Sequence, residues 1–325
     1  MAYNDLIDKT DAAALIPEDV ADSIFKELVE RNPVFQLARR LPNMSRRQER
    51  MAVGSALAQA YFVNGDTGLA QTTAMEWENK YVYAEKLAAI IPVSKDVVND
   101  SEYDIWGEAQ PELIRAFDKT VCGALFNGIN IPALWTTALG AAGLVALCTA
   151  NSKTVSIAAF TDLYEAIMGE SADGATDGLL MLLEDQGYVV NGHIAHPRMR
   201  GRLRNCRSTD GVPLFTIGEP AGGGVLGRDI DGAPVYFPRD GAVAATALDI
   251  AGDWSKLVYS IRKDITFEFS DQAVITDAEG KVVTNLFQQD MVALKATMRL
   301  GFALPNPVTP MATAATRCPF ALLTA

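Results

Sequence analysis

The sequence has few residues of the types that bind metals or form cross-links. Its 325 residues include two histidines and four cysteines, and no two cysteines form a C-x-x-C pair. Free thiols are therefore expected, rather than a disulfide framework. His193, His196 and Cys206 are the one group that resembles a ligand set, but a zinc site normally needs three or four better-matched ligands. We predict a core or surface role for all three, and no cofactor.

Positive charge is also scarce. The chain has 28 Lys and Arg against 40 Asp and Glu, and its net charge is −12. A protein whose main task is to grip nucleic acid needs clustered Lys and Arg to neutralise phosphates. The composition therefore disfavours that class and suits a surface along which a polyanion slides without adhering.

The signatures of common enzymes are absent as well. No GxSxG, HExxH or GxxxxGK[ST] motif occurs in the sequence. Gly222, Gly224 and Gly227 spell GxGxxG, but a dinucleotide site needs a helix directly after that motif. Here Pro234 and a predicted strand follow instead, so a glycine-rich loop is expected. The chain is not expected to be an enzyme, and an α/β nucleotide-binding enzyme using this loop is the alternative from another class.

No secretion signal is visible, because residues 1–20 are acidic and lack an apolar core. Residues 131–150 carry no charge over twenty positions, which is the length of a membrane span. This segment also contains Pro132, Gly140 and Gly143. We therefore predict a buried or interface-covered connector, and no membrane partner.

A long amphipathic helix is predicted to follow Pro111, which can open a helix but cannot continue one. The cap-type residues Asn99, Asp100 and Ser101 precede a helical run that this proline should interrupt. The helix should end at Asn127-Gly128. Its apolar residues recur every four positions, at Leu113, Phe117, Val121 and Leu125.

Residues 91–128 combine an I-P-V-S start, an acidic D-S-x-x-D-I opening and a long helix that ends in F-N-G. In this combination they resemble the spine-helix region of HK97-type phage major capsid proteins. A second passage resembles the closing strand of the same family and has alternating apolar residues from Val292 to Phe302. Its matching residues are Leu286-Phe287, Asp290, Ala293-Leu294-Lys295, Arg299, Gly301 and Pro305. A weaker match is His196-Pro197 followed by Asp210-Gly211-Val212-Pro213-Leu214.

This resemblance implies an α+β, HK97-like capsid fold. The expected parts are an N-terminal arm (1–51), an E-loop with flanking strands (52–90) and a P-domain with the spine helix (91–135). An A-domain (136–256), return strands of the P-domain (257–300) and a C-terminal segment (301–325) follow.

A β-hairpin with aromatic side chains is predicted before the spine helix. Residues 56–63 look like one strand, Asn64-Gly65 is a turn signal, and residues from Met75 onward alternate with period two. One face of the second strand should be half-buried. A lone hairpin is marginally stable, so this face must pack on its own core or on a neighbouring molecule. The resemblance favours the neighbour, with these contact residues: Tyr61, Phe62, Asn64, Gly65, Trp77, Tyr81 and Tyr83.

Two groups of arginines are candidate contacts. One lies in the arm, at Arg39, Arg40, Arg46 and Arg47. The other is expected to form a stripe on one helix after His196-Pro197, at Arg198, Arg200, Arg202 and Arg204. For both groups the alternatives are salt bridges to neighbouring subunits, contact with DNA, or an ordinary solvated surface.

The resemblance implies a major capsid protein of a tailed double-stranded DNA phage. Copies would form the hexamers and pentamers of an icosahedral shell around the genome, in a virion assembled in the host cytoplasm. Expected partners are a portal, a separate scaffold and DNA held by confinement, with a decoration protein as an optional addition. An encapsulin-type nanocompartment shell is the alternative within the fold. Some family members cross-link through an E-loop lysine, and residues 64–75 contain none, so no covalent network is expected.

Overall fold

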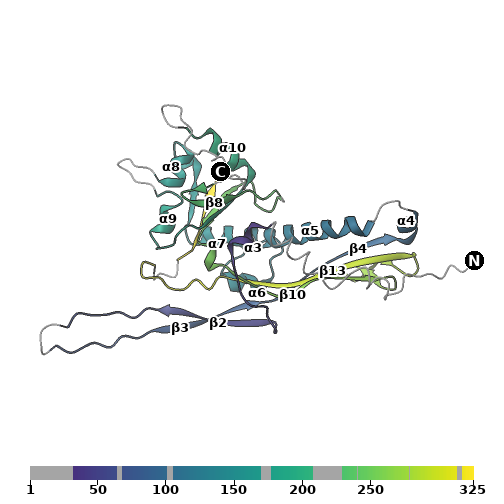
Figure 1. The fold of residues 1–325 in the computed structure, drawn as a ribbon, viewed down its shortest axis with the longest axis horizontal. Coiled ribbons are helices and arrows are strands. Elements are labelled where there is room, and N and C mark those ends of the chain that lie inside the picture. The colour runs from purple at the N-terminus through teal and green to yellow at the C-terminus, as the bar shows by residue number, and fades with distance from the viewer. Residues whose placement is uncertain are drawn as a thin grey trace, which may run out of the picture.

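The computed structural model describes residues 32–63, 68–100, 105–169, 177–207, 229–239, 241–277, 279–312 and 317–325. Figure 1 shows three parts: a long horizontal unit, a compact unit above one end of it, and a thin two-stranded arm. We call these the elongated unit, the compact unit and the hairpin arm. The arm projects away from the other two parts at the end that carries the compact unit.

A four-stranded sheet and one long helix form the elongated unit. The strand order is β1-β10-β13-β4, with β1 at Arg39–Arg40, β10 at Val258–Ser270, β13 at Met291–Ala303 and β4 at Glu85–Ser94. Helix α5 (Ile105–Asn127) lies along the sheet. Its predicted apolar stripe is buried in the same core as the even-numbered residues of β13 from Leu294 to Phe302. The long strand and its inward face are confirmed.

The prediction that Pro111 interrupts the helix is wrong, because α5 runs through it from Ile105. Trp106 and Ala109, which precede the proline, pack against the main core. The indole of Trp106 also meets the ring of Phe269 edge-on, with 5.1 Å between centroids. This packing offsets the hydrogen bond that proline cannot donate. The helix has 23 residues and is about 34 Å long.

The predicted caps are also corrected. Asn99 and Asp100 lie inside a separate short helix, α4 (Lys95–Asp100), while Ser101 falls outside the described residues. At the same end of the elongated unit, β11 (Val274–Thr276) and β12 (Val282–Asn285) form a small antiparallel hairpin.

The compact unit is a six-stranded sheet covered by short helices. Its strand order is β5-β14-β9-β6-β8-β7. The strands span Thr154–Ser156, Phe320–Thr324, Ala247–Gly252, Gly192–Ala195, Ala233–Tyr236 and Asp229–Ile230 in that order. Helices α8 (Leu163–Met168), α9 (Met181–Glu184) and α10 (Pro197–Asn205) cover it, and a 3-10 turn (Ile157–Ala159) follows β5.

The two units share one continuous apolar core. Trp254, in a 3-10 turn at Trp254–Lys256, is fully buried and meets Phe126 of α5 and Phe320 of β14 edge-on. Short helix α3 (Pro33–Leu37) adds buried Val34 and Phe35 to this core. The compact unit is therefore fixed on the elongated unit by side-chain packing.

The uncharged segment at 131–150 forms two helices, α6 (Ala133–Leu139) and α7 (Leu144–Ala150). Trp135, Leu139 and Leu144 are buried in the main core, as the connector prediction requires. In the described ranges no single helix has the length and composition of a membrane span. The pair α6–α7 passes that test only as a bent pair, with 46° between its helices.

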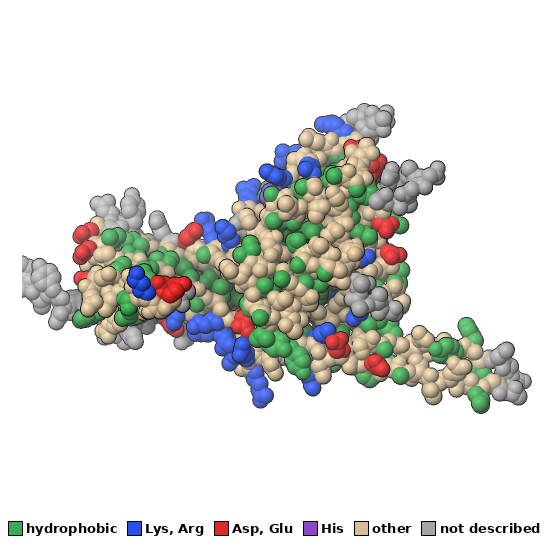
Figure 2. Space-filling model, turned by 180° about the vertical axis from the view of Figure 1, so that it is seen from behind, with side chains coloured by type: hydrophobic (Ala, Val, Ile, Leu, Met, Phe, Trp, Pro, Cys, Tyr) green, Lys and Arg blue, Asp and Glu red, His purple; other side chains and the backbone are tan. Residues whose placement is uncertain are grey.

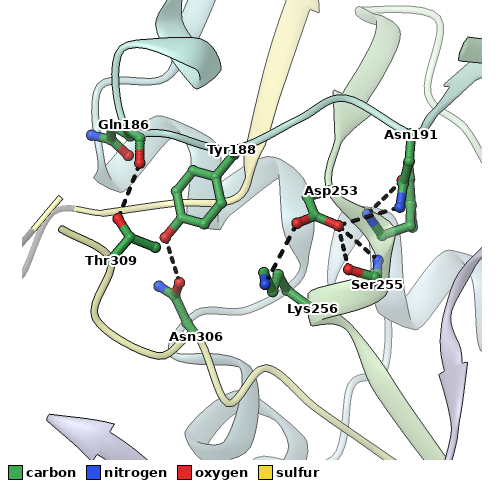
Figure 3. A network of polar contacts seen from close by, with 9 residues as sticks. Gln186, Tyr188, Asn191, Asp253, Ser255, Lys256, Asn306 and Thr309 are labelled. Atoms are coloured by element: carbon green, nitrogen blue, oxygen red, sulfur yellow. Dashed lines mark hydrogen bonds and ion pairs between the residues drawn. The ribbon is translucent and has the colours of Figure 1, made fainter. Parts of the chain in front are cut away.

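Polar side chains hold the C-terminal segment against the compact unit (Figure 3). The Tyr188 hydroxyl donates to Asn306 Oδ1 over 2.7 Å, and the Thr309 hydroxyl donates to the Gln186 carbonyl over 3.1 Å. Nearby, Asp253 accepts hydrogen bonds from Asn191 and Ser255. Residues 304–312 are thereby held in place although they form no helix or strand.

Tyr188 predicts a loss of stability at alkaline pH. Burial raises the pKa of Tyr188 to about 12. The folded chain then holds the phenolic proton more tightly than the unfolded chain, whose pKa is near 10. This contribution is complete below about pH 10 and is lost as the pH rises toward 12. We expect Tyr188→Phe to cost about 1 kcal/mol at pH 8 through the lost hydrogen bond, and the wild type to lose this advantage by pH 11.5. Urea unfolding at both pH values tests this, and a constant difference would contradict it.

Candidate intersubunit surfaces

The hairpin arm consists of β2 (Gln48–Ala56) and β3 (Glu76–Tyr83), followed toward its tip by residues 57–63 and 68–75. Its root is firmly attached. Val82 and Ala84 are fully buried in a cluster with Met44, Val258 and Ala303. The indole nitrogen of Trp135 donates to the Tyr83 carbonyl over 3.0 Å. The arm is therefore rigid at its base.

The sequence prediction misplaced the first strand and left open which face of the second is buried. Residues 57–63 form no strand, because the ladder pairs residues 48–56 with residues 76–83. Val82 of the second strand and Ala84 directly after it are buried, whereas Trp77 on the other face is 68% exposed. Tyr81 and Tyr83, on the face of Trp77, are half-buried, and their ring centroids are 6.1 Å apart. The aromatic face is thus largely uncovered in the single chain.

Apolar exposure increases toward the tip of the arm. Every described residue from 57 to 75 is exposed, and Phe62 and Leu69 are 106% and 90% exposed. Tyr61 is 54% exposed and its hydroxyl donates to Gln59 over 2.7 Å, while Asn64 and Gly65 lie outside the described residues. Scattered exposed apolar residues are ordinary, but a contiguous apolar arm is typical of a surface that a partner covers.

The close approach of β13 to the arm root at Gly301 leaves no room for a side chain. A Cβ atom at Gly301 would lie 2.3 Å from the Tyr83 carbonyl oxygen, so β13 passes directly under the arm at this residue. We expect Gly301→Ala to cost about 2–3 kcal/mol, because the backbone of the arm root must move. Gly54→Ala, in the arm itself, is the control, since nothing lies within 4 Å of its Cβ. Equal urea midpoints for the two variants would contradict the prediction.

The two groups of arginines lie far apart. Arg39, Arg40, Arg46 and Arg47 are exposed near the arm root, where Arg47 pairs with Glu85 over 3.3 Å. The other group is on α10, at the opposite side of the molecule (Figure 1). The structure therefore does not unite them into one basic surface.

The predicted single stripe on α10 is wrong. Successive residues of an α-helix are about 100° apart, so every second residue changes side. Arg198 and Arg202 share one side, and Arg200 and Arg204 share another. Arg200 is half-buried, whereas the other three are exposed.

The residues considered as metal ligands have separate roles. His193 is fully buried and its Nδ1 lies 2.8 Å from Oδ2 of Asp249, which is also fully buried. His196 caps α10 by accepting a hydrogen bond from the Arg198 amide, and Cys206 is buried beyond the other end of the helix. Among the described residues, no group of three or more His, Cys, Asp or Glu could hold a metal ion. All four cysteines are free and buried, and the Gly222–Gly227 loop lies outside the described residues.

Comparison with known proteins identifies the class of protein to which this architecture belongs. A model of the family described as "Phage capsid family" matches residues 12–309. The chain belongs to the phage capsid family. The "Major capsid protein" of Staphylococcus phage 80alpha is 26% identical over 286 residues, which are 87% of this chain and 79% of that protein. A "Probable major capsid protein gp17" of Mycobacterium phage D29 is 24% identical over 300 residues.

A solved structure from Microbacterium phage Oxtober96 superimposes with a TM-score of 0.73 and 28% identity. The match covers 98% of this chain and 99% of that chain. The predicted α+β, HK97-like fold is confirmed. Membership of the phage capsid family makes this chain a structural protein of a phage shell. It supports the capsid interpretation over the nucleotide-binding enzyme.

Proposed function

We propose that this capsid protein is the major shell subunit of a tailed double-stranded DNA phage. Copies assemble into hexamers and pentamers that close into an icosahedral shell around the genome. The observation that carries the proposal is the hairpin arm, which has a rigid root and an apolar tip that the single chain leaves uncovered. Head-to-tail contacts between identical subunits produce rings when the rotation closes, and the arm supplies such a contact.

The regions have different roles in this proposal. The arm corresponds to the E-loop, the elongated unit to the P-domain and the compact unit to the A-domain. Tyr61, Phe62, Trp77, Tyr81 and Tyr83 contact a neighbouring subunit, with Asn64 and Gly65 at the turn. Each contact can be weak, because several act together on each subunit.

The other partners follow from the same role. DNA is held by confinement, consistent with the net charge of −12, and a portal, a scaffold and a decoration protein are the expected partners. Assembly takes place in the host cytoplasm. The arginines at 39, 40, 46 and 47 and those on α10 serve contacts between subunits in preference to DNA contacts.

Negative-stain electron microscopy of the purified protein tests the proposal. We expect closed shells of uniform diameter, built from rings of subunits. Sedimentation velocity should show a concentration-dependent shift from the single chain to a large particle. A chain that remains monomeric at every concentration would contradict the proposed function.

A further inference from the structure

The outer face of the elongated sheet carries an unexpected row of cations. Arg299 of β13 is the register partner of Lys86 on β4 and of Lys263 on β10. Directly opposed residues of antiparallel strands point to the same face, with their Cβ atoms about 5 Å apart. These three side chains therefore form a line across three strands. We call them the basic row.

The basic row is unfavourable for the folded single chain. Like charges that oppose each other directly destabilise a sheet. In the described part of the chain, no carboxylate lies within 4.0 Å of Lys86, Lys263 or Arg299. The buried Nε of Arg299 also has no hydrogen-bond partner there. An anionic partner from outside the chain would relieve the repulsion among these three cations.

The local backbone is shaped around the same residues. The pairing of β10 with β13 shifts register on both sides of the Lys263–Arg299 pair. Such bulges re-aim side chains and are concentrated at functional sites. Two residues further along β13, Gly301 lies under the root of the hairpin arm. Figure 2 shows Lys and Arg side chains gathered on the underside of the molecule, beside the place where the arm begins.

The opposite charge is concentrated at the far end of the elongated unit. Lys95 there pairs with Asp290 over 3.0 Å and with Asp271 over 3.8 Å. Lys281 is the other cation of this end, against six acidic residues, which gives a net charge of −4. The six are Asp96, Asp100, Asp271, Asp277, Glu279 and Asp290. We call this set the acidic end.

The acidic end also carries exposed apolar side chains. On and beside the β11–β12 hairpin, Val282 is 57%, Val283 60% and Phe287 76% exposed. The outer face near the basic row offers Ile90, which is 48% exposed. Both surfaces thus combine a net charge, of opposite sign on the two, with apolar area, as the two sides of a protein interface do.

A chain cannot join its own basic row to its own acidic end. Arg299 is eight residues along β13 from Met291, the residue that follows Asp290, which puts about 26 Å between them. That separation is about three Debye lengths at physiological salt. The complementary surface must come from another molecule.

We infer that the basic row binds the acidic end of a second copy of this chain. The inference rests on the proposed function, which supplies many copies, and it names a contact distinct from the arm. Nucleic acid fits less well, because three cations in a chain of net charge −12 would attract phosphates weakly.

Charge reversal on each side, alone and combined, tests the inference. The variant Lys86→Glu/Lys263→Glu reverses two exposed members of the row, and Asp277→Lys/Glu279→Lys reverses part of the acidic end. We expect each to raise the critical concentration for assembly about tenfold at low salt. The defect should shrink when the ionic strength reaches about 0.5 M. The two variants combined in one chain should assemble at nearly the wild-type concentration.

The matched control is Arg115→Glu/Lys119→Glu on the exposed side of α5, which changes the net charge by the same amount. It should assemble like the wild type. Circular dichroism checks the fold of every variant. If Lys86→Glu/Lys263→Glu does not fold, Lys86→Gln/Lys263→Gln repeats the test without adding negative charge.

The possible outcomes separate the alternatives. Wild-type shells together with undiminished assembly of the row variants would overturn this inference alone. The same holds if the combined variant is not rescued, or if the row variants form normal shells that only retain less DNA. A wild-type chain that stays monomeric would overturn the proposed function and this inference with it.

Discussion

Replacing Phe62, Leu69 and Trp77 together with serine is expected to abolish shell assembly and leave the single chain folded. These side chains are 106%, 90% and 68% exposed, so the folded chain gains almost nothing from them. A neighbouring subunit that covered them would gain about 1.5–3 kcal/mol for each. Losing this burial free energy at every contact between subunits should prevent closure of the shell, because the shell depends on many modest contacts.

Light scattering and electron microscopy measure the assembly of this triple variant, and a urea titration measures its fold. The matched control replaces three exposed apolar residues on and beside the compact unit with serine. They are Met181, Val189 and Met311, which are 47%, 76% and 67% exposed. The control should assemble normally if the arm is the specific contact. Normal shells from the arm variant, or an equal defect in the control, would show that the arm is not that contact.

Replacing His193 with alanine is expected to give the largest loss of stability. His193 and Asp249 are fully buried, 2.8 Å apart, on the neighbouring strands β6 and β9. Removing one member of a buried pair leaves the other without its partner, which typically costs about 3–5 kcal/mol. Oδ1 of Asp249 already lacks a partner in the described structure, so no second donor is available to compensate.

Urea unfolding with linear extrapolation measures this loss, which appears as a lower midpoint. The control is Asp249→Asn, which keeps the shape and a hydrogen-bonding oxygen and should cost clearly less than His193→Ala. A loss below about 1 kcal/mol for His193→Ala would mean that the pair behaves like a surface ion pair. That result would contradict the claim that burial of the His193–Asp249 pair makes the loss of one partner costly.

The features that the sequence predicted correctly are those set by local periodicity. The alternation from Val292 to Phe302 is the inward face of β13, and the four-residue repeat from Leu113 to Leu125 is the buried stripe of α5. Helix α10 begins at Pro197, where the sequence placed a helix after His196-Pro197. Each of these patterns depends on neighbours along the chain.

The errors arose where contacts distant in sequence decide the outcome. Pro111 lies inside α5 because Trp106 packs against Phe269, a residue that no local pattern connects to it. Alternation in residues 75–83 also left open which face is covered, and packing under the arm root buries Val82 and leaves Trp77 exposed. The register that aligns Lys86, Arg299 and Lys263 also becomes visible only when three strands are paired.

The central claim is that this chain leaves an apolar arm bare so that a second copy can cover it. A cryo-electron microscopy reconstruction of the assembled particle measures this directly. The account predicts density in which residues 57–63 and 68–75 of one subunit lie against an adjacent subunit, with Phe62 and Trp77 buried between them. A shell in which the arm points into solvent, or folds back onto its own subunit, would contradict it.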